Sequence, residues 1–220
     1  MATLGEYLGA GSGTTKLLLH LNGNSTDSSG NSNNGTDTAI TYSQANGKFG
    51  QGAGFNGSSS KINCGTSAGL LLNIFTWSFW VNLPNYNKYS ALAETNTSAA
   101  GGALLRINGT TGILVLVKTN IVDIGQSTDA VPVGVWTNVI VTYNSTTGAY
   151  AFYINSKNAG SGTNAQTFVH HDFSIGIIYN TPVVDFFNGL LDEVIVENIA
   201  WTPQQVQKYY TFAKGRFGIV

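Results

Sequence analysis

Apolar and polar residues alternate along many short stretches of the chain, a pattern that predicts β-strands with one buried face. The clearest alternation runs from Phe75 to Asn82, where Trp80 lies on the face opposite the other aromatic residues. Turns rich in Gly, Asn and Ser separate the stretches, as in hairpins. The stretches with strand character are 15–22, 40–42, 60–64, 75–82, 90–94, 103–107, 113–118, 121–125, 135–143, 149–155, 173–178 and 187–198. This pattern predicts an all-β fold in which two antiparallel sheets form a jelly-roll sandwich.

Only one segment carries convincing helix signals, and it lies near the end of the chain. Thr202 suits an N-cap, Pro203 suits the first helical position, and Gln205 is placed for a capping box. Gly215 is expected to end this helix. The sequence thus predicts one short C-terminal helix beside the sandwich.

The strand pattern covers residues 16–213 without a linker or an internal repeat. Residues 1–15 are rich in Gly, Ser and Thr, and we expect them to form an N-terminal arm. Residues 214–220 form a short tail that ends in apolar residues. The predicted organisation is therefore one domain with an arm and a tail.

The last strand-like stretch contains a carboxylate among apolar residues. Period-two alternation places Asp192 on one face with Val194 and Val196, and Glu193 on the other. A carboxylate on a core face must be protonated, hydrogen-bonded or bound to a cation. What satisfies Asp192 is therefore a central question about this fold.

The charge content narrows the classes of partner. The 220 residues include 10 basic and 11 acidic side chains, and charged residues make up 10% of the chain, against about 25% in an average domain. Because no basic stripe exists, we do not expect nucleic-acid binding. A neutral surface rich in Ser, Thr and Asn is typical of secreted, virion-exposed or sugar-binding proteins.

Cys64 is the single cysteine, so no intramolecular disulfide forms, and its strand context predicts a small buried apolar residue. The N-terminal residues lack the pattern of a secretory signal. No stretch approaches the ~20 apolar residues of a membrane span, so membrane insertion is not expected.

Six sequence motifs occur in the order seen in a known family. The chain resembles the laminin-G-like branch of the concanavalin A-like lectin/glucanase sandwiches over roughly residues 16–213. The resembling motifs are Leu18–Gly23 with Asp27–Thr36, Gly52–Ser58, Phe75–Val81, Trp136–Tyr143 with Ala151–Asn155, Phe187–Val194, and Trp201–Tyr209.

The resemblance implies two antiparallel sheets, one of them bent, with ligands on the concave face or the loop rim. It also implies a structural calcium site in many members, for which Asp27 and Asp192 are the residues that fit here. Calcium prefers six to eight oxygen ligands, and the loop after Asp27 offers many. The alternative is that Asp192 accepts backbone N–H groups from that same loop and needs no metal.

Catalysis by paired carboxylates does not fit the last strand. Retaining glycosidases need two carboxyl groups about 5–5.5 Å apart. Asp192 and Glu193 are predicted on opposite faces, while Glu193 and Glu197 would lie about 13 Å apart along a strand. Asp123, Asp129, Asp172 and Asp185 occupy loop-like contexts without identifiable partners. We therefore predict no enzymatic activity.

The histidines do not indicate a metal site. His170 and His171 are adjacent, so on a strand they would point in opposite directions, and we favour a solvated loop. His20 is isolated within an apolar strand. Zinc would need more nitrogen or sulfur ligands than this pattern offers.

Aromatic residues are the remaining lead to a ligand site, because sugar sites use exposed rings with polar neighbours. Trp77 and Trp136 fit core positions of the family, and Trp201 is expected to anchor the helix. Trp80, Tyr86 and Tyr89 are less constrained, and they are our candidate ligand-binding residues. Ordinary surface aromatics are the alternative.

Three functional hypotheses follow from the sequence. The first is a non-catalytic structural or decorating subunit of a larger particle, such as a bacteriophage capsid or tail. It would be made in a host cytoplasm, lie on the virion exterior, contact other virion proteins and belong to an oligomer. The second is a carbohydrate-binding or adhesion module, extracellular or at a cell surface, that binds cell-surface glycans. The third is a glycoside hydrolase, which the spacing of the acids disfavours.

Overall fold

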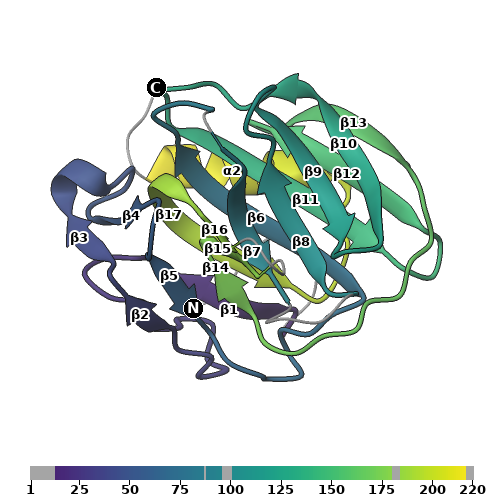
Figure 1. The fold of residues 1–220 in the computed structure, drawn as a ribbon, viewed down its shortest axis with the longest axis horizontal. Coiled ribbons are helices and arrows are strands. Elements are labelled where there is room, and N and C mark those ends of the chain that lie inside the picture. Colours follow the sequence, from purple (N-terminus) through teal and green to yellow (C-terminus); the bar gives the residue numbers. More distant parts are fainter. Residues whose placement is uncertain (1–12, 87, 96–100, 180–183, 217–220) are drawn as a thin grey trace.

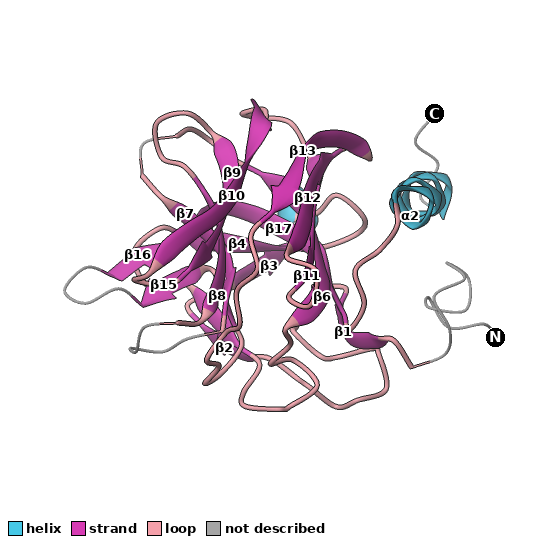
Figure 2. Cartoon of the chain, turned by 90° about the vertical axis from the view of Figure 1, so that its right-hand side faces the viewer, coloured by secondary structure: helices cyan, strands magenta, loops and turns pink. Residues whose placement is uncertain are grey.

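The computed structural model describes residues 13–86, 88–95, 101–179 and 184–216. Two antiparallel sheets pack face to face, and the C-terminal helix lies on the outer side of one of them (Figures 1 and 2). A small hairpin lies against the outer side of the other sheet. The predicted all-β jelly-roll sandwich with one C-terminal helix is confirmed.

The sheet beside the helix has eight strands within the described residues. Its order is β13-β12-β11-β6-β17-β4-β3, and β1 pairs with β17 off this path. The bounds are β1 Thr15–Leu19, β3 Thr41–Ser43, β4 Gly52–Asn56, β6 Ile74–Asn82, β11 Thr137–Asn144, β12 Ala149–Ile154, β13 Lys157–Thr163 and β17 Asn188–Glu197. The long and mostly buried strands β6, β11 and β17 are neighbours at the centre of this sheet.

The opposing sheet has seven strands in the part of the chain described, in the order β10-β9-β8-β7-β14-β5-β2. Its strands are β2 Thr36–Thr38, β5 Lys61–Asn63, β7 Ser90–Glu94, β8 Ala103–Ile107, β9 Ile113–Lys118, β10 Val122–Ala130 and β14 Ser174–Ile175. The hairpin of β15, Ile177–Tyr179, and β16, Val184–Phe186, contacts β7 on its outer face. A short 3-10 helix, η1, spans Gln44–Asn46.

The main core fills the space between the two sheets. From β6 it receives Phe75, Trp77 and Phe79, each fully buried, and Phe75 stacks on Trp77 with ring centroids 4.4 Å apart. The predicted alternation of this strand is therefore correct. Cys64 is also a buried core residue, as predicted, and burial raises the pKa of its thiol.

The helix α2, Pro203–Arg216, covers the outer face of the eight-stranded sheet. Its predicted capping box is present, because Thr202 N donates to Gln205 Oε1 over 2.8 Å and Gln205 N donates to Thr202 Oγ1 over 3.3 Å. Gly215 lies inside the helix and does not end it. Within the residues described, no helix has the length and apolar character needed to cross a membrane.

Of the predicted arm and tail, the structure describes only residues 13–15 and 214–216. Thr15 begins β1, and residues 214–216 are the last turn of α2. The rest of both predictions lies outside the described residues.

Candidate functional site

Trp80 is not on an exposed surface, which corrects its prediction as a ligand-binding residue. Its side chain is 2% exposed and lies beneath α2. Phe49 meets its ring edge-on with centroids 5.1 Å apart, and Tyr210 stacks on it at 5.8 Å. The face of β6 opposite the main core is thus a second core, because the helix covers it.

Tyr86 and Tyr89 differ in what they offer a ligand. Tyr86 is partly buried against the main core, and its hydroxyl donates to the carbonyl oxygen of Val131. Its ring fills the space above Gly112, where a Cβ atom would clash with it. Tyr89 is 40% exposed, and the guanidinium of Arg106 lies over its ring, 4.4 Å from the centroid. Of the three predicted aromatics, Tyr89 has the exposure that ligand contact needs.

Asp192 lies on the helix side of β17, not on the core face with Val194 and Val196. The register against β6 shifts between Asp192 and Ile195, and Glu193 adopts a φ of 47°. This bulge moves the alternation by one residue. Leu191, Val194 and Val196 therefore face the main core, whereas Asp192 pairs with Trp80 in the second core.

Backbone N–H groups satisfy the fully buried carboxylate of Asp192. Its Oδ2 accepts from Lys48 N and Phe49 N, each over 2.8 Å, and its Oδ1 accepts from Glu193 N over 2.9 Å. Burial raises the pKa of Asp192 to about 7, against the lowering effect of these donors. Asp192 therefore fastens the segment after η1 to β17, and not the loop after Asp27 as the sequence predicted.

Asp27 makes a separate set of contacts within its own loop and to β1. Its Oδ1 accepts from Leu18 N and Ser29 N over 3.0 and 2.9 Å, while Oδ2 accepts from the Ser29 hydroxyl and Asn33 N over 2.8 and 2.9 Å. Both oxygens thus have two donors each, which occupies their lone pairs.

The two aspartates do not fit a single calcium site, because they bind different segments through backbone donors. Among the described residues, no group of three or more His, Cys, Asp or Glu side chains could hold a metal ion. Calcium binding to this chain stays a prediction.

The other acids of β17 also have partners inside the fold. His20 Nδ1 lies 2.8 Å from Glu193 Oε1, and the Thr15 hydroxyl donates to Glu197 Oε1 over 2.6 Å. Burial raises the pKa of Glu197. These carboxyl groups lie on the helix side of the eight-stranded sheet or at the bulge.

The segment around His170 is more buried than the predicted solvated loop. Asp172 is buried and accepts a hydrogen bond from Asn63 Nδ2. His170 Nδ1 lies 2.8 Å from Thr95 Oγ1, and burial lowers the pKa of His170 to about 4. His171 remains exposed, as predicted.

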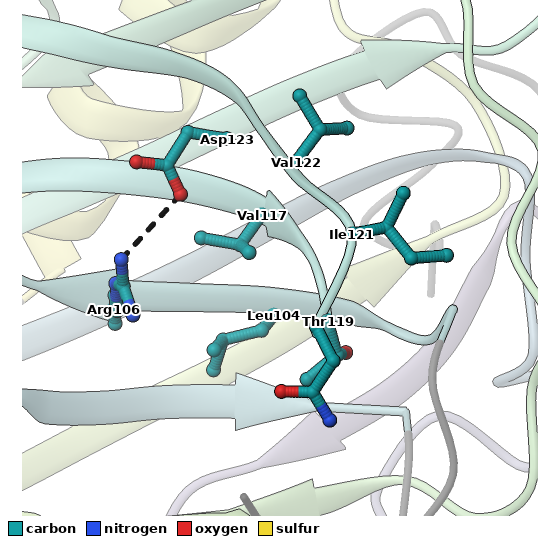
Figure 3. Close-up of a pocket in the computed structure, with 8 residues that line it drawn as sticks. Leu104, Arg106, Val117, Thr119, Ile121, Val122 and Asp123 are labelled. Carbon is teal, nitrogen blue, oxygen red and sulfur yellow. Dashed lines mark hydrogen bonds and ion pairs between the residues drawn. The ribbon is translucent and has the colours of Figure 1, made fainter.

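A hollow of about 290 Å³ opens on the outer face of the seven-stranded sheet, at the end formed by β8, β9 and β10 (Figure 3). Its size is at the lower limit of small-ligand pockets, which span ~300–1,000 Å³. Ile121 at its rim is 57% exposed. The lining residues are Leu104, Arg106, Val117, Thr119, Asn120, Ile121, Val122 and Asp123.

Arg106 and Asp123 are the two charged residues of this lining, and they face one another at one end of it (Figure 3). Arg106 Nη2 lies 3.4 Å from Asp123 Oδ1. The Arg106 side chain is 17% exposed and its Nε has no hydrogen-bond partner among the described residues, whereas the Asp123 side chain is 61% exposed. Arg106 also lies over the ring of Tyr89, a residue outside the lining. The lining therefore presents the N–H donors of Arg106 next to the accessible carboxylate of Asp123.

Glu94 lies beside the hollow, paired with Leu104 across β7 and β8. It is fully buried, and its Oε2 accepts from Tyr179 N of the covering hairpin over 2.8 Å. Burial, and to a lesser extent the nearby charge of Asp172, raise the pKa of Glu94 to about 8. The carboxyl is therefore mostly protonated at neutral pH.

Glu94 predicts how stability depends on pH. Because its folded pKa of about 8 exceeds its ordinary value of 4.5, folding favours the protonated form. The stability that protonated Glu94 contributes to the folded state is complete below pH 4.5 and is lost as pH rises through 8. Asp192 acts in the same direction up to about pH 7.

We expect the midpoint of thermal unfolding to be higher at pH 5 than at pH 8. Calorimetry of the wild type and of Glu94→Gln across this range measures the effect, because glutamine can accept the same N–H group but does not titrate. The variant should show a shallower decline, and an identical decline in both proteins would contradict the assignment.

The sequence identified neither Arg106 nor Asp123 as a site residue. Arg106 is one polar residue in an apolar strand, a weak signal of an outward-facing position. Asp123 falls within the predicted strand 121–125, although its local context resembles a loop; in the structure it belongs to β10 and pairs with Val117 of β9. Only the register of the neighbouring hairpins brings the two side chains together.

Comparison with known proteins identifies the superfamily to which this fold belongs. The laminin G family model described as the concanavalin A-like lectin/glucanases superfamily matches residues 56–207. The chain belongs to this superfamily. The resemblance predicted from the motifs is thus confirmed, and no curated protein sequence matches the chain.

Solved structures share the superfamily fold over most of the chain. Domain 4 of AbnA, a GH43 extracellular arabinanase from Geobacillus stearothermophilus solved in complex with arabinotriose, is 25% identical with a TM-score of 0.74. The match covers 88% of this chain and 97% of that one. The binding domain of Paraclostridial Mosquitocidal Protein 1 is 16% identical with a TM-score of 0.70, covering 91% of this chain and 52% of that one.

The botulinum neurotoxin serotype G binding domain is 16% identical with a TM-score of 0.65, covering 91% of this chain and 51% of that one. This chain therefore spans about half of each toxin chain, and at these identities the toxins show the fold alone.

Proposed function

We propose that this chain is a non-catalytic carbohydrate-binding module that holds a glycan in the hollow on the outer face of the seven-stranded sheet. The observation that carries the proposal is the Arg106–Asp123 pair in the lining of the hollow, with the ring of Tyr89 packed against Arg106. Sugar hydroxyls both donate and accept hydrogen bonds, and the C–H faces of a sugar ring pack on apolar or aromatic surface. Donors, an acceptor and exposed apolar rim residues meet at this one place.

Related structures support the same class of ligand. Domain 4 of the arabinanase AbnA was solved with arabinotriose bound, and it matches this chain over nearly the whole of both. The cell entry of botulinum neurotoxin type C, whose binding domain shares this fold, is dependent upon interaction with two ganglioside molecules.

Glycan binding should weaken when the side chain of Arg106 or Tyr89 is removed. A glycan array, followed by calorimetric titration of the glycans that bind, compares the wild type with Arg106→Ala and Tyr89→Ala. We expect Arg106→Ala to weaken binding about tenfold or more, because charge-assisted hydrogen bonds contribute roughly 1.5–3 kcal/mol.

The matched control is Lys157→Ala, which removes an exposed cation paired with Asp129 at 3.3 Å, away from the hollow. Lys157→Ala should bind glycans like the wild type. The proposal fails if the wild type binds no glycan on the array, or if Arg106→Ala and Lys157→Ala bind equally well.

The decorating-subunit hypothesis also stays a prediction, together with the virion localisation and the assembly partners. It depended on the arm and tail, most of which lie outside the described residues. Light scattering of the full chain and of a variant lacking residues 1–15 measures assembly, and a monomer in both would oppose it.

A further inference from the structure

We infer that the hollow selects neutral sugars and that Asp123 is the residue that excludes acidic ones. This inference rests on the proposed function and specifies its ligand class. The relevant contrast is between a glycan bearing only hydroxyl groups and one bearing a carboxylate, such as a uronic or sialic acid.

The guanidinium of Arg106 in the hollow is already paired with the carboxylate of Asp123. Asp123 Oδ1 lies 3.4 Å from Arg106 Nη2, longer than a strong charge-assisted hydrogen bond of about 2.7–2.9 Å. The Arg106 guanidinium lies on Tyr89, which restricts where it can go. A ligand carboxylate that reached Arg106 would therefore lie beside the Asp123 carboxylate, and this like-charge contact opposes binding.

No second cation in the described lining offsets that repulsion. The lining contains one positive and one negative side chain. Lys118, on the adjacent strand, points to the other side of the sheet, where its Nζ lies 3.5 Å from Gln166 Oε1. Glu94, the acid next to the hollow, is buried and adds little negative charge at neutral pH.

A neutral sugar suits the same pair of side chains. One hydroxyl can accept from an N–H of Arg106 while a neighbouring hydroxyl donates to the Asp123 carboxylate, whose high exposure leaves its second oxygen accessible. Both charges thus keep hydrogen-bond partners and neither has to lose its counter-charge. The Asn120 amide, also in the lining, offers one further donor and acceptor.

Isothermal titration with matched sugar pairs tests the inference. The probes are lactose against sialyllactose and galactotriose against trigalacturonate, together with arabinotriose as a neutral trisaccharide. Each is titrated into the wild type, Asp123→Asn and Asp129→Asn at low and high salt. Asp129→Asn makes the same charge change on the same strand, at a carboxylate paired with Lys157 away from the hollow.

We expect the wild type to bind a neutral member more tightly than its acidic counterpart. Asp123→Asn should improve binding of the acidic member about two- to fivefold relative to the neutral one, the range of exposed charge interactions. The gain should shrink at high salt, and Asp129→Asn should show none.

The outcomes separate the two claims. Equal or tighter binding of the acidic probes by the wild type, or an equal gain in both asparagine variants, overturns this inference and leaves the proposed function standing. If the wild type binds none of these probes and no other array glycan, the proposed function fails and this inference fails with it.

Discussion

Asp192→Ala is expected to lower the free energy of unfolding by about 3–5 kcal/mol. The carboxylate is fully buried and accepts N–H groups from Lys48, Phe49 and Glu193. Alanine leaves these donors without partners, and each unpaired buried donor costs about 1–3 kcal/mol. The loss concerns stability, because Asp192 lies on the helix side of the eight-stranded sheet, whereas the hollow is on the seven-stranded sheet.

Denaturant unfolding at pH 5 measures this effect. Asp129→Ala is the control, since Asp129 is exposed and should change stability by no more than about 0.5 kcal/mol. Asp192→Asn should lie between the two, because its amide oxygen can still accept from Lys48 and Phe49 while its NH₂ group opposes Glu193 N. An Asp192→Ala protein as stable as Asp129→Ala would show that the segment after η1 does not need this anchor.

The sequence led correctly to Asp192 but not to its partners, for a physical reason. Period-two alternation assumes an unbroken strand, and the bulge at Glu193 breaks it. Nothing in the local sequence marks a bulge, because Glu193 is not a glycine. The hydrogen bonds from Lys48 and Phe49 join segments more than 140 residues apart, so sequence alone could not reveal them.

Strand prediction worked best where one face of a strand is buried in the main core. The predicted bounds 90–94, 103–107 and 113–118 agree with β7, β8 and β9. Strands without such a pattern were missed, including β2, whose three residues are all exposed, and β13, which is rich in polar residues and glycine. Their pairing depends on neighbouring strands more than on their own composition.

The candidate site was the least predictable part. Arg106 and Asp123 are 17 residues apart, and they meet only because β8, β9 and β10 form consecutive hairpins. Trp80, in contrast, was predicted as a ligand-binding residue although it is buried. The sequence placed it correctly on the face opposite the main core, but could not show that α2 covers that face.

Trp80→Ala is expected to lower the free energy of unfolding by about 3–5 kcal/mol while leaving glycan affinity unchanged. Removing a buried indole costs its transfer free energy and leaves a cavity between Phe49 and Tyr210. Lys48 also loses a cation–π contact, since its Nζ lies 5.5 Å from the Trp80 ring. The hollow is on the other sheet, so a folded Trp80→Ala protein should still bind glycans like the wild type.

Denaturant unfolding measures the loss of stability, and calorimetric titration measures the glycan affinity. Both are carried out at a temperature well below the thermal unfolding midpoint. Trp80→Phe should recover part of the stability, whereas Tyr89→Ala should show the reverse pattern, with weak binding and little change in stability. Reduced glycan binding by a fully folded Trp80→Ala protein would restore Trp80 as a ligand residue.

The two stability predictions are also coupled. Asp192 accepts a hydrogen bond from Phe49 N, and the ring of Phe49 packs on Trp80. Once one of these contacts is removed, the segment after η1 can detach, so removing the other should cost less. The double variant should therefore lose less stability than the sum of the single losses. Strict additivity would mean that Asp192 and Trp80 stabilise separate parts of the fold, and that α2 docks without help from the segment after η1.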